Sequence, residues 1–176
     1  MTTLDILKKR NHDFATHRFD AGLTLMPTLR TMIISCVDPR VDPAHALGLE
    51  PGEAVVIRNI GGRITPATLQ TMALLRTISQ VEGVNPRGRF DLVVLHHADC
   101  GITRLEGKPD LLASYFGIDT AELESKAVLN PRAAVAVDVA ILKANSLLPG
   151  EWAVSGLVYD VTTGLVETVV APASLP

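Results

Sequence analysis

The sequence predicts an α/β fold with a mainly parallel central β-sheet and helices on its faces. Three short runs, at residues 31–36, 54–58 and 90–97, are rich in Val, Ile and Leu and are continuous rather than alternating. Continuous runs of this kind are typical of parallel strands that are buried on both faces. Helix-like segments separate the runs, and strands that alternate with helices indicate a parallel sheet.

Two helical regions are expected before the third run. Residues 4–26 are polar with scattered apolar positions, and they predict a helical N-terminal arm within residues 1–28. A second helix is expected from Pro66 to about Val81. Proline suits the first turn of a helix, and Thr65 can cap the open N–H groups at its start.

The second half of the chain continues this pattern. Residues 109–125 predict a looser helical stretch, and Pro131–Leu147 predict a clearer helix with Asn130 as its N-cap. Residues 152–160 and 165–170 predict two strands joined by a turn that contains glycine. We therefore expect the last strand to be antiparallel to its neighbour.

Length, composition and charge limit the functional classes. A chain of 176 residues can bury a substantial core, and we expect a single domain over residues 1–176. The net charge of −3 and the lack of a basic stripe argue against nucleic acid as a partner. No segment reaches about 18 apolar residues, and the N-terminus lacks the apolar core of a signal peptide, so no membrane span is expected. A cytoplasmic location follows as the expectation.

The two cysteines lie where strand-like runs end. Cys36 ends the first run, and Cys100 follows His97 by three residues at the end of the third run. Ligands of parallel sheets bind at the carboxyl ends of strands where the strand order reverses, so these side chains are expected in one crevice. Two thiolates and an imidazole predict a zinc site with an open fourth position, as in catalytic zinc sites.

Two other interpretations of the cysteines stay open. Either Cys36 or Cys100 alone is compatible with a small buried apolar residue. A disulfide is the other alternative, but a reducing compartment favours metal binding or catalysis.

Asp38 and Arg40 follow the first cysteine closely. They are two residues apart, so in an extended segment both side chains leave on the same side. A bidentate pair would hold Asp38 ionised and oriented beside the metal, as a catalytic pair; the alternative is a surface salt bridge. His96 is expected on the opposite face of the strand from His97, as a structural residue.

Arg58, Gly61 and Gly62 follow the second strand-like run and are candidates for binding substrate. A glycine pair lets backbone amides approach an anion closely. The alternative is a tight turn between a strand and a helix.

Three motifs, in this order, resemble those of the β-class carbonic anhydrases: Cys36-x-Asp38-x-Arg40, Arg58-Asn59-x-Gly61-Gly62 and His97-x-x-Cys100-Gly101. The segment from Gly156 to Gly164 fits as well, so the resemblance runs from about residue 30 to residue 170. It implies one zinc ion per subunit on Cys36, His97 and Cys100. It also implies an N-terminal arm that wraps a neighbour in an obligate homodimer, often doubled to a tetramer.

The resemblance implies reversible hydration of carbon dioxide to bicarbonate and a proton through a zinc-bound hydroxide, with Asp38 and Arg40 as the catalytic pair. In some members the aspartate, here Asp38, takes the fourth zinc position at lower pH. The compact bacterial branch with this pattern also resembles enzymes that hydrolyse carbonyl sulfide or carbon disulfide. Ile60 stands where the family commonly has a small residue. A third alternative is a non-catalytic protein that binds zinc or bicarbonate, which would not need the Asp38–Arg40 pair.

Overall fold

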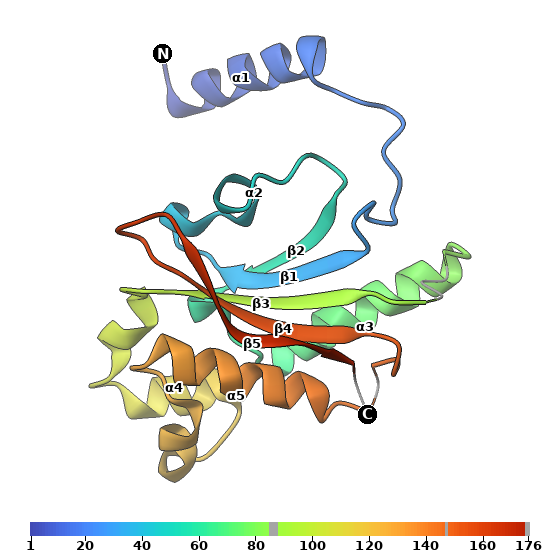
Figure 1. Ribbon diagram of the computed structural model, residues 1–176. Helices are drawn as coiled ribbons and strands as arrows, with labels where there is room; N and C mark the ends of the chain where they lie inside the picture. The colour runs from blue at the N-terminus through green and yellow to red at the C-terminus, as the bar shows by residue number, and fades with distance from the viewer. Residues whose placement is uncertain (85–87, 147, 175–176) are drawn as a thin grey trace.

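The fold is a five-stranded sheet with helices, and the predicted fold class is confirmed (Figure 1). The computed structural model describes residues 1–84, 88–146 and 148–174. In space the described strands follow the order β2-β1-β3-β4-β5, with parallel pairing from β2 to β4 and antiparallel pairing between β4 and β5. The strands are β1 (Thr31–Cys36), β2 (Ala54–Asn59), β3 (Asp91–His97), β4 (Ala153–Tyr159) and β5 (Val166–Ser174).

The order of the strands creates a crevice between β1 and β3. The chain passes from β1 to β2 on one side and then returns to place β3 on the other side of β1. Ser35 of β1 is level with Leu95 of β3, so both strands end at the same edge. The strand order therefore reverses where the first cysteine and the third strand end, which is where open α/β sheets bind ligands.

One face of the sheet packs against α3 (Pro66–Val81) and α5 (Pro131–Lys143). Alternate residues of the strands point to this face, as the period of two requires. The core there is formed mainly by Met32, Ile34, Leu92, Val94 and Val154 from the strands, and by Met72, Val135, Val139 and Leu142 from the helices.

The predicted starts of α3 and α5 are confirmed, but the predicted end of α5 is not. The side chain of Thr65 accepts a hydrogen bond from the backbone N–H of Thr68, and that of Asn130 accepts from the first turn of α5. The predicted end of α5 at residue 147 is wrong, because the helix ends at Lys143 and a turn follows. Leu147 itself lies outside the described residues.

The N-terminal arm is shorter than predicted. Helix α1 (Thr3–His17) is followed by turns, so the prediction of helix to residue 26 is wrong. The Asp20 side chain accepts a hydrogen bond from the Gly22 N–H in a local turn, which competes with continuation of the helix. α1 stands away from the sheet and has no buried residue (Figure 1).

The sheet edge at β2 also differs from the prediction. Its residues are mostly half-buried, and Val56 is 38% exposed, because β2 has a neighbour on one side only. Continuous apolar sequence therefore overstated the burial of this strand. Among the described residues, no helix is long and apolar enough to cross a membrane.

Short helical turns surround the crevice. The 3-10 turns η1 (Pro39–Val41), η2 (Ile60–Gly62) and η3 (Gly101–Leu105) come soon after β1, β2 and β3. The small helix α2 (Pro43–Ala46) follows η1. The stretch predicted at 109–125 consists of α4 (Pro109–Phe116) and η4 (Thr120–Lys126), since Gly117 ends α4 with a φ of 66°. Three turns at the same edge of the sheet thus form the walls of the site.

Candidate metal centre

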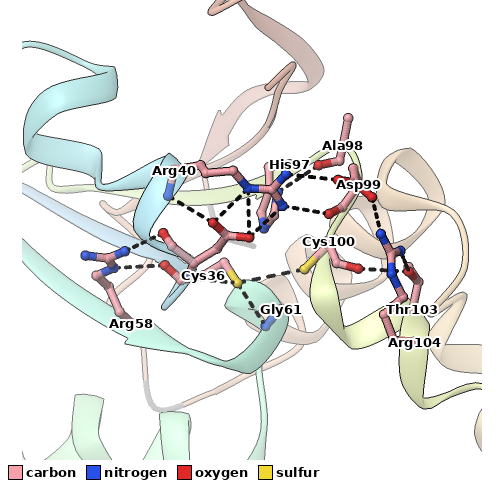
Figure 2. A network of polar contacts seen from close by, with 11 residues as sticks. Cys36, Arg40, Arg58, Gly61, His97, Ala98, Asp99, Cys100, Thr103 and Arg104 are labelled. Carbon is pink, nitrogen blue, oxygen red and sulfur yellow. Dashed lines mark hydrogen bonds and ion pairs between the residues drawn. The ribbon is translucent and has the colours of Figure 1, made fainter. Parts of the chain in front are cut away.

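Cys36, His97 and Cys100 lie together at the carboxyl ends of β1 and β3, as the strand-end argument predicted (Figure 2). One potential ligand atom from each residue lies within 4.8 Å of the others, and all three residues are buried. The two Sγ atoms are 3.8 Å apart, and both cysteines are free thiols. The arrangement offers two sulfur ligands and one nitrogen ligand, a set that zinc prefers.

The orientation of His97 fits a metal ligand. Its Nδ1 atom lies 2.8 Å from the carbonyl oxygen of Ala98, to which it donates when it carries the proton. Nε2 is buried and has no hydrogen-bond partner in the part of the chain that the structure describes. Histidine ligands of metals usually donate their other ring N–H to a carbonyl or carboxylate, so Nε2 is left with a free lone pair.

Two backbone amides support the sulfur of Cys36. The N–H of Asp38 lies 3.4 Å from this Sγ atom, and that of Gly61 lies 3.3 Å from it. Gly61 and Gly62 have φ values of 78° and 66°, which favour glycine. A Cβ atom on Gly62 would lie 2.9 Å from the carbonyl carbon of Ser35, so a side chain there would displace β1.

The contact between the two thiols shifts their pKa values in opposite directions. Contact with Cys100, followed by contacts with His97 and the two amides, lowers the pKa of Cys36 in spite of burial. The same contact with Cys36, together with burial, raises the pKa of Cys100. Burial lowers the pKa of His97, but Cys36 and the Ala98 carbonyl outweigh it and raise the pKa overall. A second thiolate this close needs a positive counter-charge, which a divalent metal ion supplies.

Asp38 and Arg40 form the predicted bidentate pair, but the backbone between them is a 3-10 turn and not an extended segment. Nε of Arg40 donates to Oδ1 of Asp38 at 3.1 Å, and Nη2 donates to Oδ2 at 2.8 Å. The segment is not extended as predicted, because Asp38 caps η1 and accepts the Arg40 backbone N–H at 2.9 Å. The hydrogen bond from Arg40 lowers the pKa of Asp38 to about 2, so this carboxyl group is ionised at neutral pH.

Asp99 joins this pair and was not predicted from the sequence. Nη1 of Arg40 donates to Oδ2 of Asp99 at 2.9 Å, and Arg104 binds the other carboxylate oxygen (Figure 2). Hydrogen bonds from Arg40 and Arg104 lower the pKa of Asp99. Its place between His97 and Cys100 in the sequence was a signal that it lies at the site.

Arg58 braces the chain that follows β1. Its Nε donates to the carbonyl oxygen of Cys36 at 2.8 Å, and its Nη2 donates to that of Asp38 at 2.8 Å. Nη1 donates to Asp42 at 2.7 Å. These contacts of Arg58 are all within the protein. Substrate binding by Arg58, Gly61 and Gly62 stays a prediction.

His96 turns away from the cysteines, as expected from strand alternation. Its Nε2 lies 3.2 Å from the carbonyl oxygen of Gly62 and 3.1 Å from Oδ2 of Asp138. Arg63 donates to the same Asp138 oxygen at 2.6 Å, and both charged residues are fully buried. This ion pair was not predicted from the sequence, because its members are 75 residues apart and Asp138 lies inside an apolar helix.

A cavity of about 200 Å³ adjoins the cluster. Gly61, His97 and Cys100 line one side of it, and Ile102, Val128 and Leu129 give it an apolar wall. Arg63, His96, Asp99 and Thr103 also line the cavity, so it presents polar as well as apolar groups beside the potential metal ligands.

Comparison with known proteins places the chain in a family. Residues 31–114, which contain the whole cluster, match the family model described as carbonic anhydrase. The carbonic anhydrase of Streptococcus mutans has a similar structure, with a TM-score of 0.72 and 31% identity over 96% of this chain and 98% of that one. The chain belongs to the β-carbonic anhydrase family. Beta-carbonic anhydrase 1 of Mycobacterium tuberculosis is 32% identical over 102 residues, which span 58% of this chain and 57% of the relative's length.

Similarity within the β-carbonic anhydrase family extends to a second activity. The carbon disulfide hydrolase of an Acidianus strain is 26% identical over 187 residues, covering 91% of this chain and 85% of the hydrolase. The corresponding enzyme of Saccharolobus solfataricus is 27% identical over 182 residues. Membership of the family therefore leaves more than one substrate to consider.

Proposed function

We propose that this chain is a zinc enzyme that catalyses the reversible hydration of carbon dioxide to bicarbonate and a proton. The observation that carries the proposal is the buried cluster of Cys36, His97 and Cys100 beside an ionised Asp38 that Arg40 holds. A protein that only stores metal has no need of an oriented carboxylate next to the ligands. One zinc ion per subunit is the expected content.

The residues present fit zinc. The Sγ atoms of Cys36 and Cys100 and the free Nε2 of His97 would hold the ion, with the fourth position left for water or substrate. When bound, zinc supplies a Lewis acid that activates water at moderate pH. The N–H groups of Asp38 and Gly61 lie against the Cys36 sulfur and would share part of its negative charge when the ion is held.

Asp38 is the residue that would act on the reacting water. As an ionised carboxylate it can only accept, so it takes a hydrogen bond from the attacking water and turns the water's lone pair toward the substrate carbon. Arg40 prevents Asp38 from collecting the proton itself, because the hydrogen bonds between them hold the pKa of Asp38 at about 2. The released proton must therefore pass to solvent by another acceptor.

A second candidate reaction is hydrolysis of carbonyl sulfide or carbon disulfide by the same residues. The similarity to two carbon disulfide hydrolases over most of their length favours keeping it. Its attack on carbon needs the same oriented water, and the apolar cavity wall suits a polarisable sulfur compound. A third candidate is a non-catalytic protein that binds zinc or bicarbonate.

One preparation tests all three candidates. Zinc content per chain is measured first, followed by the rate of carbon dioxide hydration and the rate of sulfide release from carbonyl sulfide and carbon disulfide. Fast hydration with negligible sulfide release supports the proposal, whereas the reverse result assigns the hydrolase activity. A zinc-loaded protein that is inactive on every substrate would be a binding protein.

We also propose a closed state in which Asp38 leaves Arg40 at lower pH and takes the fourth zinc position. The supporting observation is its place two residues after Cys36, with a backbone N–H on the Cys36 sulfur. A zinc-loaded crystal structure at pH 6 in which Asp38 still pairs with Arg40 would contradict this state.

For the assembly, we propose a single domain over residues 1–176, acting in the cytoplasm as a homodimer that can double to a tetramer. Free cysteines suit a reducing compartment. The arm, residues 1–28, supports pairing because Leu4 and Leu7 are exposed on one side of a helix that buries nothing in its own subunit. The mass of the particle in solution, measured by light scattering for the full chain and for a chain without residues 1–28, tests this.

A further inference from the structure

Arg40 is held between two carboxylates rather than by one. Its Nε and Nη2 atoms face Asp38, while Nη1 donates to Oδ2 of Asp99 on the other side. Nη2 also donates to the backbone oxygen of Asp99 at 3.0 Å. The guanidinium is a rigid planar fork, so contacts at opposite ends fix both its position and its plane.

Asp38 alone is a weak anchor for this arginine. The Arg40 side chain is 47% exposed, and exposed arginine–carboxylate pairs contribute little because water competes with them. Asp38 is 14% exposed and belongs to the same turn as Arg40, so their contact does not tie the turn to the rest of the site. Asp99 provides that tie, because it lies between His97 and Cys100 on the other ligand-bearing segment.

Asp99 is itself anchored. Its backbone has a φ of 53°, and Arg104 binds the carboxylate oxygen that Arg40 leaves free. Arg104 in turn donates from Nη1 to Thr103, whose hydroxyl donates to the carbonyl oxygen of Cys100 at 2.8 Å. A continuous chain of hydrogen bonds therefore runs from a metal-site cysteine through Arg104 and Asp99 to Arg40 (Figure 2).

We propose that Asp99, anchored by Arg104, is a positioning residue that orients Arg40 and through it Asp38. The inference rests on the proposed function, in which Asp38 directs the reacting water. Asp99 is not a member of the metal-ligand cluster, and its influence passes through Arg40. Loss of this support should therefore slow turnover without removing zinc or weakening the binding of a small substrate.

The variant Asp99→Ala tests this directly on zinc-loaded protein. We expect kcat to fall about tenfold while KM and zinc content stay within about twofold, since misdirected groups cost rate rather than binding. Asp99→Asn keeps an oxygen acceptor for Nη1 and should restore kcat to within about threefold of wild type. In the background Arg40→Ala, adding Asp99→Ala should cause no further loss, because residues that act through one another are not additive.

A second readout does not depend on activity. The Nε–H resonance of Arg40 in ¹⁵N NMR should broaden and exchange faster with water in Asp99→Ala, and should stay near its wild-type behaviour in Asp99→Asn. The matched control is Glu167→Ala, which breaks the exposed Arg132–Glu167 pair between α5 and β5 and should alter neither kcat nor the Arg40 resonance.

Three results would overturn the inference: an unchanged Arg40 resonance in Asp99→Ala, loss of zinc in that variant, or a fall in kcat that is equally large when Asp99→Ala is made in the wild type and in Arg40→Ala. Failure of the proposed function looks different. In that case the wild-type protein turns over none of the three substrates, while the resonance of Arg40 still reports whether Asp99 positions it.

Discussion

Two charge clusters in this chain use the same chemical groups in opposite surroundings. The site cluster, Asp38, Arg40, Asp99 and Arg104, is partly exposed at the mouth of the crevice. The buried cluster, Arg63, Asp138 and His96, is enclosed by α5, β3 and the turn after β2. Both clusters pair an arginine with a carboxylate. The site cluster lies beside His97, and the buried cluster contains the preceding residue, His96.

The difference shows how burial decides what an ion pair does. Water can reach the site cluster, so its carboxylates stay ionised but its geometry depends on several weak contacts. The buried cluster excludes water, so its charges must remain paired, and it joins elements that are far apart in the sequence. We infer that the site cluster controls chemistry and that the buried cluster controls stability.

The largest effect is expected from removing a residue that both clusters support. Cys36→Ala removes a predicted metal ligand. The sulfur of Cys36 accepts a hydrogen bond from the Gly61 N–H, and the carbonyl oxygen of the next residue, Gly62, lies 3.2 Å from Nε2 of His96 in the buried cluster. Zinc content should fall toward zero and activity should be lost, and the thermal midpoint with zinc should drop to that of the chelator-treated wild type. Elemental analysis measures the zinc content, and calorimetry measures the thermal midpoint. A variant that keeps one zinc per chain would show that Cys36 is not a ligand.

A change in the buried cluster should affect stability alone. Asp138→Asn leaves Arg63 buried without a counter-charge, and we expect the free energy of unfolding to fall by about 3–5 kcal/mol. Denaturant titration measures the loss. The protein that remains folded should bind zinc and turn over substrate at near the wild-type rate, so a specific loss of kcat would break the comparison.

A change in the site cluster should have the opposite signature. Asp38→Ala should retain zinc and lower kcat by about a hundredfold, since the carboxylate orients the reacting water. Its denaturant midpoint should be close to that of wild type, because the partner that it leaves, Arg40, can be hydrated by solvent. A rate near wild type would show that the positioning role of Asp38 is wrong.

The smallest effect concerns the pH profile. Two thiolate ligands cancel the charge of the zinc ion, whereas a site with three histidines keeps it and activates water near pH 7. Carbon dioxide hydration by this chain should therefore rise from pH 6 to pH 9, by about tenfold or more if one ionisation above pH 7 controls it. Stopped-flow rates at constant ionic strength would measure this, and a flat profile would contradict it.

The parts that were predictable from the sequence are contacts within one turn and contacts that follow from the common edge at which parallel strands end. Strand-end cysteines and His97 could be placed together because parallel strands end at a common edge, and the caps Thr65 and Asn130 act within a single turn. The pairing of Asp38 with Arg40 was predicted correctly even though the backbone between them is a 3-10 turn. Contacts within a turn, and the alignment of parallel strand ends, leave little room for alternatives.

The parts that were missed depend on tertiary packing. Asp138 lies in an apolar helix, and no residue near it in the sequence indicates that Arg63 is its partner. The two residues meet only when β2, β3 and α5 have assembled. The burial of β2 was overestimated because a sequence does not reveal which strand will lie at the edge of a sheet. The length of the arm was overestimated because polar sequence alone does not mark where a helix stops.

The arm has a consequence for how the protein responds to dilution. α1 has 15 residues and a capping box at Thr2, and helices of this length are only marginally populated in water when they have no tertiary support. If a second subunit supplies that support, the helicity of the arm follows the law of mass action, whereas the sheet folds within one chain. On dilution, circular dichroism would then lose the signal of the α1 helix before that of the sheet. The helicity of the arm would therefore report assembly, and the signal of the sheet would report folding.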